Sequence, residues 1–113
     1  QVVLEYLKLS SKMVRGIVEI LISKLGVTLN ESKIEQIMGE KVVNLNYYPP
    51  CPNPELTVGL GRHSDLGTIT VLLQDEIGGL YVKMEDNDAG KEEWLLIPPI
   101  PGALVINIGD VLQ

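Results

Sequence analysis

Cysteine and histidine are nearly absent from this chain of 113 residues, which has one of each, Cys51 and His63. A single cysteine excludes an internal disulfide and a zinc cluster built from cysteines. A single histidine excludes a metal site that takes two or more histidines from these residues. Any site that needs two histidines is therefore incomplete within this sequence.

Cationic residues are also scarce, with nine Lys and Arg against fifteen Asp and Glu and a formal charge of −6. This balance lacks the basic footprint of a protein that binds nucleic acid or an anionic membrane. The longest uncharged apolar run, residues 95–109, contains three prolines and cannot form a membrane-spanning helix. The N-terminus has no signal peptide and no Met, so we expect a cytoplasmic location and a start inside a longer protein.

A helical period predicts a first helix over residues 1–25 and a second, shorter helix over 30–38. Gly26 and Gly39 are expected to end them. The N-cap of the second helix is either Thr28, which has capping-box spacing with Glu31, or Asn30. The first helix has an apolar stripe formed by Val3, Leu7, Val14, Ile17, Leu21 and Leu25.

The pattern changes at Lys41 to a period of two, which predicts a strand over 41–48. Tyr47 would lie on its apolar face and serve packing, whereas Asn46 and Tyr48 would share a polar face. That polar face would be half exposed or would line a polar cavity. The prolines at 49–54 then interrupt regular pairing.

Further strands are predicted from alternation and flanking turns over 68–74, 80–84, 94–97 and 103–108, the last one buried. A charged loop is expected over 85–93, and Asp110 is interpreted as a turn residue. Two helices followed by several short strands predict an α+β fold with an antiparallel sheet or part of a barrel.

The strongest candidate site lies at His63-Ser64-Asp65, just before a predicted strand. Residues two apart in an extended segment point the same way, so His63 and Asp65 could present a nitrogen and an oxygen to one divalent ion. They would supply two of the three ligands of the two-His-one-carboxylate triad of non-haem Fe(II) oxygenases. The alternative is an ordinary surface histidine beside an aspartate.

Several longer motifs resemble those of the plant 2-oxoglutarate- and Fe(II)-dependent dioxygenases. The matching runs are Asn46-Tyr47-Tyr48-Pro49-Pro50-Cys51-Pro52-Asn53-Pro54-Glu55-Leu56-Thr57, His63-Ser64-Asp65, Leu72-Leu73-Gln74-Asp75 and Asn107-Ile108-Gly109-Asp110. The resemblance extends from residue 41 to residue 113 with matching order and spacing. Motifs in register over this length are far more specific than a His-x-Asp pair.

The resemblance implies a helical lead-in over 1–39 and part of a double-stranded β-helix, or jelly roll, over 40–113. His63 and Asp65 match iron ligands, and Asn46 and Tyr48 match positions that bind 2-oxoglutarate. The second histidine, the Arg-x-Ser motif and the last strands of the family are expected beyond residue 113. The chain is therefore interpreted as a fragment, inactive alone, of an enzyme that uses Fe(II), 2-oxoglutarate, O2 and ascorbate as a reductant.

Within this family, residues 56–65 and 77–83 resemble the feruloyl-CoA ortho-hydroxylases and scopoletin hydroxylases of coumarin synthesis. This implies a monomeric parent enzyme of phenylpropanoid secondary metabolism that hydroxylates an aromatic small molecule, such as feruloyl-CoA at the ortho position. Two alternatives stay open: an iron oxidase that does not use 2-oxoglutarate, and a degenerate β domain without catalysis.

Overall fold

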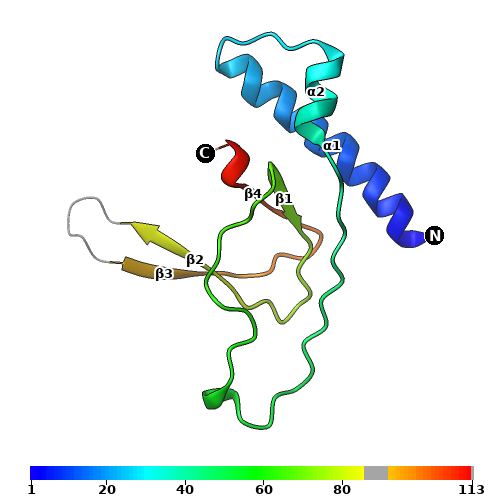
Figure 1. Cartoon of the computed structure of the whole chain (residues 1–113). Coiled ribbons are helices and arrows are strands. Elements are labelled where there is room, and N and C mark those ends of the chain that lie inside the picture. The colour runs from blue at the N-terminus through cyan, green and yellow to red at the C-terminus, as the bar shows by residue number, and fades with distance from the viewer. Residues whose placement is uncertain (86–91, 113) are drawn as a thin grey trace. The chain divides into compact units, whose positions relative to one another are not determined.

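The computed structural model describes residues 1–85 and 92–112. Of the loop predicted over 85–93, residues 86–91 lie outside the described residues, whereas Glu85, Glu92 and Glu93 belong to strands, so the loop is shorter than predicted. The chain forms two compact units, one from Gln1–Ile69 with the C-terminal segment that starts at Ile108, and one from Thr70–Asn107. Figure 1 shows the order of the elements: two helices, a long connection, and four short strands. The predicted α+β class is confirmed. Among the described residues, no helix has the length and apolar character to cross a membrane.

The first helix, α1, spans Val2–Lys24, as its apolar period predicted. The chain leaves the helix at Gly26, whose φ of +73° is a conformation that glycine adopts without steric cost. Val18 is 1% exposed and is the one fully buried large side chain among the described residues. The core of this unit is therefore small.

The second helix, α2, spans Glu31–Met38, and the structure selects Asn30 as its N-cap. The Asn30 side-chain oxygen accepts a hydrogen bond of 3.0 Å from the Lys33 N–H, which satisfies a backbone donor that the first helical turn leaves unpaired. Gly39 ends the helix at φ +49°, and its N–H donates to the Glu35 carbonyl at 3.1 Å.

Arg15 joins the two helices. Its guanidinium contacts Glu19 of α1 at 2.9 Å, and it reaches Glu31 and Glu35 of α2 at 2.5 and 2.7 Å. The fixed fork of donors in a guanidinium suits several carboxylates at once. Hydrogen bonds, first with Glu31 and then with Glu19, raise the pKa of Arg15 above its ordinary value. A single cation thus fixes the register of α2 on α1.

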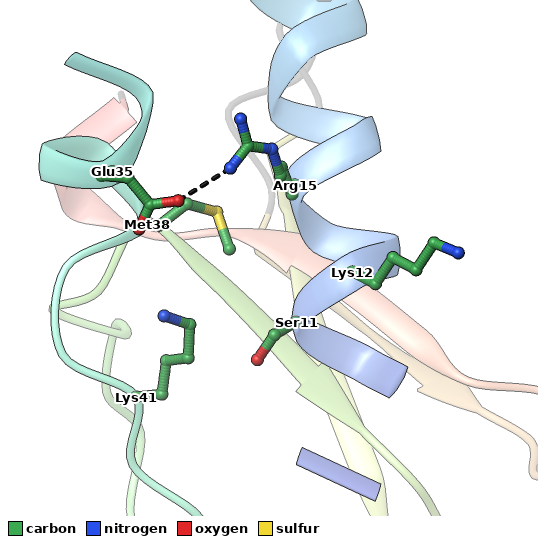
Figure 2. A pocket seen from close by; sticks show the side chains of 6 residues that line it. All are labelled: Ser11, Lys12, Arg15, Glu35, Met38 and Lys41. Carbon is green, nitrogen blue, oxygen red and sulfur yellow. Dashed lines mark hydrogen bonds and ion pairs between the residues drawn. The ribbon is translucent and has the colours of Figure 1, made fainter. Parts of the chain in front are cut away.

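A hollow of about 220 Å³ lies beside this ion-pair cluster, and Figure 2 shows the Arg15–Glu35 contact at its wall. Both cationic and anionic side chains line this hollow. None of the four candidate site residues, Asn46, Tyr48, His63 and Asp65, is among them. The lining residues are Ser11, Lys12, Arg15, Glu35, Met38 and Lys41.

The strand predicted over 41–48 is wrong. From Gly39 to Thr68 the chain forms a long excursion whose only regular element is the 3-10 turn Pro54–Leu56, as Figure 1 shows. Alternation alone does not make a strand, because a ladder needs a hydrogen-bonded partner, and no described segment pairs with 41–48. Tyr47 is 84% exposed, so its predicted packing role is wrong as well.

The second unit consists mainly of two two-stranded sheets. Strands β1, Ile69–Leu72, and β4, Val105–Ile108, form one pair. Strands β2, Leu80–Glu85, and β3, Glu92–Ile97, form an antiparallel pair in which Leu80 lies opposite Ile97.

The turn before β2 requires glycine. Gly78 has φ +72°, and a Cβ there would lie 2.8 Å from the Cδ of Pro99. Gly79 follows with φ +118°. The predicted turn at these positions is confirmed.

Strand β4 is not the buried strand that its apolar sequence predicted. Ile106 and Ile108 are both exposed. Burial of a strand requires a second layer over its face, and the described residues provide no such layer here. The 3-10 turn Asp110–Leu112 follows directly.

Candidate metal centre

The structure brings the side chains of His63 and Asp65 together. The His63 Nε2 lies 3.5 Å from Asp65 Oδ1, with side chains that are 52% and 30% exposed. Neither residue belongs to a strand, so the pairing comes from the local backbone and not from a sheet. The predicted convergence of a nitrogen and an oxygen is therefore present.

The other nitrogen of His63 determines which tautomer faces Asp65. The His63 Nδ1 lies 2.8 Å from the Gly61 carbonyl oxygen, and a carbonyl can only accept, so Nδ1 carries the proton. In the neutral ring, Nε2 then carries the lone pair that a metal ion could accept. A histidine that donates through one nitrogen and coordinates through the other is the usual arrangement of a metal ligand.

The spacing of these two atoms fits a divalent ion. Two ligand atoms at right angles on a metal, each about 2.1 Å from it, lie about 3 Å apart. The observed 3.5 Å needs only a small side-chain rotation to reach that value. An imidazole nitrogen with a carboxylate oxygen is also a donor pair that suits iron(II).

The described residues bring two such donors together and not three. In the parts of the chain that the structure describes, no group of three or more His, Cys, Asp and Glu side chains could hold a metal. The assignment of His63 and Asp65 as two ligands of a facial triad stays a prediction.

Residues 65–68 are held by a segment more than forty residues later in the chain. The Gly109 N–H donates to the Thr68 carbonyl at 3.0 Å, and the Asp110 N–H donates to the Asp65 carbonyl at 2.8 Å. A longer bond of 3.4 Å joins the Val111 N–H to the Gly67 carbonyl. The backbone at Asp65 is thus hydrogen-bonded to the C-terminal segment.

Glycine at position 109 is required by this close approach. Gly109 is buried, and a Cβ built on it would collide with the Gly67 carbonyl oxygen and lie 2.8 Å from the Asp65 carbonyl oxygen. Its φ lies outside the left-handed region, so space and not backbone strain excludes a side chain here.

Asp110 is the residue that the sequence reasoning missed. The Ser64 hydroxyl donates to Asp110 Oδ2 at 2.9 Å. This side-chain bond adds to the backbone bonds between residues 109–111 and 65–68, which we call the backbone seam. The interpretation of Asp110 as a turn residue is incomplete, because the residue begins a 3-10 turn and also contacts the serine between the two candidate ligands. Its signal was its place in the Asn107-Ile108-Gly109-Asp110 motif.

The two residues predicted to bind 2-oxoglutarate are exposed. Tyr48 is 59% exposed, and its ring lies 3.5 Å from the position a Cβ would take on Gly59. The Tyr48 ring therefore lies near Gly59, in the segment that leads to His63. Asn46 is exposed and forms no hydrogen bond with the described residues. Their role stays a prediction.

Comparison with known proteins establishes the class. The family model of the 2OG-Fe(II) oxygenase superfamily matches residues 39–113, so the chain belongs to that superfamily. Membership implies the cofactors of that superfamily, Fe(II) and 2-oxoglutarate. The resemblance found in the sequence motifs is confirmed.

Individual relatives are named as hydroxylases of scopoletin, coumaroyl CoA and feruloyl CoA. The chain is 60% identical, over all 113 residues, to the scopoletin 8-hydroxylase of Arabidopsis thaliana. It is 53% identical over 110 residues to a bi-functional coumaroyl CoA and feruloyl CoA ortho-hydroxylase of Ipomoea batatas, and 52% identical over 111 residues to feruloyl CoA ortho-hydroxylase 1 of Arabidopsis thaliana. The chain spans 30% of the length of each of these relatives. No solved structure matches it.

Proposed function

We propose that this chain is the part of a 2-oxoglutarate-dependent oxygenase that supplies two iron ligands, His63 and Asp65. The observation that carries the proposal is the approach of His63 Nε2 to Asp65 Oδ1 at 3.5 Å, with Nδ1 lying 2.8 Å from the Gly61 carbonyl oxygen. Such a pair leaves room for a cation between two donors.

When bound, iron and 2-oxoglutarate supply the oxygen-activating chemistry. The chain's own residues have the simpler task of holding them. His63 and Asp65 would hold the iron, while the Gly61 carbonyl would keep the proton of the imidazole on Nδ1 and leave Nε2 for the metal. Asn46 and Tyr48 would hydrogen-bond 2-oxoglutarate, and the nearness of the Tyr48 ring to Gly59 supports this role for Tyr48 because Gly59 lies in the segment before His63.

For the whole protein, meaning the gene product in which this chain occurs, we propose hydroxylation of an aromatic phenylpropanoid. Feruloyl-CoA, hydroxylated ortho to its side chain, is the first candidate, and scopoletin is the second. The relatives named above act on these compounds and are 52–60% identical to the chain. A CoA thioester is anionic and needs cations at the mouth of its pocket, for which Arg62 and Lys83 are candidates within this acidic chain.

The metal assignment is tested by anaerobic titration of the whole protein with Fe(II), or with Mn(II) followed by electron paramagnetic resonance. We expect His63→Ala and Asp65→Ala each to abolish measurable binding, since each removes one of the few ligands. Arg62→Ala is the matched control, because Arg62 neighbours the site and carries no ligand atom. Unchanged binding by His63→Ala would refute the assignment.

The substrate is tested by incubating the whole protein with Fe(II), 2-oxoglutarate and each compound in turn, while succinate and product mass are followed. We expect an added oxygen atom on feruloyl-CoA or scopoletin and one succinate per product. Turnover of a flavonoid alone would reject the substrate class. Product without succinate would instead indicate an iron oxidase that does not use 2-oxoglutarate.

The remaining features of the proposal come from the family resemblance. The strand pairs β1–β4 and β2–β3 belong to a jelly roll, and the whole protein is a cytoplasmic monomer that uses ascorbate as a reductant. Exclusion chromatography with light scattering tests the monomer, and a fluorescent fusion tests the location. Omission of ascorbate from the assay is expected to shorten the productive phase of turnover.

A further inference from the structure

Ser64 is the link between the candidate ligands and a distant part of the chain. It lies between His63 and Asp65 in sequence, and its hydroxyl donates to Asp110 Oδ2 at 2.9 Å. The backbone of the same aspartate donates to the Asp65 carbonyl at 2.8 Å. Asp110 therefore contacts two consecutive residues of the tripeptide, one through its side chain and one through its N–H.

We propose that Asp110 is a positioning residue that, through Ser64 and the Asp65 carbonyl, holds His63 and Asp65 in the orientation that chelates the metal. This inference rests on the proposed function of the pair. One contact holds the Ser64 side chain and the other holds the carbonyl of the Asp65–Leu66 peptide, so the backbone is restrained on both sides of the Asp65 side chain. A single contact would restrain one side only.

Asp110 does not act as a third ligand. Its Oδ2 is occupied by the Ser64 hydroxyl, and no three metal-binding side chains cluster in the described parts of the chain. Its role is to hold the side chains of His63 and Asp65 in the chelating orientation before the metal binds. Ligands held in place by outer hydrogen bonds bind a metal more tightly than ligands that must be ordered on binding.

Gly109 allows the close approach on which this arrangement depends. Because residue 109 lacks a side chain, the segment comes close enough for its N–H to reach the Thr68 carbonyl and for the Asp110 N–H to reach that of Asp65. The close approach also sets Asp110 opposite Ser64. Backbone seam and side-chain link are therefore parts of one clamp, formed by Gly109 and Asp110 on residues 64–68.

The test measures Mn(II) affinity of the metal-free whole protein by electron paramagnetic resonance. We expect Asp110→Ala and Ser64→Ala each to weaken binding by about 10- to 100-fold, the range seen when outer-shell partners are removed. The double variant is expected to be no weaker than Asp110→Ala, because both changes break the same bond. Asp110→Asn and Ser64→Thr keep the acceptor and the donor and should restore affinity to near that of the unmodified protein.

Two control variants separate positioning from loss of stability. Glu55→Ala removes an exposed carboxylate that has no hydrogen bond with the described residues, and Asn30→Ala destabilises α2 by removing its N-cap without touching the clamp. Neither should change Mn(II) affinity. If Asn30→Ala weakens binding as much as Asp110→Ala, or if the Asn and Thr variants fail to rescue, the positioning role is refuted.

Failure of the inference is distinguishable from failure of the proposed function. Suppose that His63→Ala abolishes Mn(II) binding while the Mn(II) affinities of Asp110→Ala and Ser64→Ala stay within threefold of that of the unmodified protein. The ligand assignment is then correct, but the clamp does not position the ligands. If His63→Ala binds Mn(II) normally, the ligand assignment itself is wrong, and the inference falls with it.

Discussion

Replacing Gly109 by alanine tests the seam between the C-terminal segment and residues 65–68. The added Cβ would collide with the Gly67 carbonyl oxygen and lie 2.8 Å from that of Asp65. These neighbours are backbone atoms, which cannot rotate away as the end of a flexible side chain can. The two segments must therefore separate.

The size of the effect follows from the bonds that separation breaks. The Gly109–Thr68 and Asp110–Asp65 hydrogen bonds, of 3.0 and 2.8 Å, would lengthen or break. With a net value of about 0.5–1.5 kcal/mol for each bond, their loss costs about 1–3 kcal/mol. Overpacking a tight site costs about the same amount.

Native-state hydrogen exchange of the whole protein, followed by mass spectrometry, is the assay. A local destabilisation of about 1–3 kcal/mol predicts exchange roughly 5- to 150-fold faster in peptides that cover residues 105–112. Peptides from α1 should keep their rates.

Gly16→Ala is the matched control, because it adds the same methyl group in open space. No atom lies within 4 Å of a Cβ at position 16, which is inside α1. Alanine is favoured over glycine by about 1 kcal/mol in a helix interior, so exchange in α1 should slow. If Gly109→Ala exchanges at the unmodified rate, the close approach does not constrain the segment and the reasoning is wrong.

Three further predictions concern the helices and the exposed strands. Asn30→Ala should destabilise α2 by about 1 kcal/mol, measured as faster exchange of its first-turn amides, because the Lys33 N–H loses its acceptor. Arg15→Met should speed the hydrogen exchange of α2 and make that exchange independent of salt, whereas Lys12→Met should do neither. Salt is the right perturbation, because the raised pKa of Arg15 keeps its side chain charged as pH increases. The 113-residue chain on its own should self-associate in light scattering, because Trp94 and Ile108 are among many apolar side chains left exposed on its strands; a stable monomer at high concentration would contradict this.

The features that the sequence alone determined are local ones. The period of the apolar residues defined α1 and α2, and a Gly beyond each helix defined its end. The spacing of His63 and Asp65 was enough to predict that a nitrogen and an oxygen converge, because only the few bonds between them decide it. Each of these features depends on residues within about one helical turn of each other.

Tertiary structure decided the features that depend on distant partners. The alternation of apolar and polar residues over 41–48 predicted a strand, but no described strand pairs with this segment. The apolar sequence of β4 predicted a buried strand, but its isoleucines are exposed. Asp110 meets Ser64 across 46 positions of sequence, and Arg15 meets Glu35 across 20. Hydrogen bonds and ion pairs of this kind form only where the folded backbone brings donor and acceptor within about 3 Å, a condition that local sequence preferences do not specify.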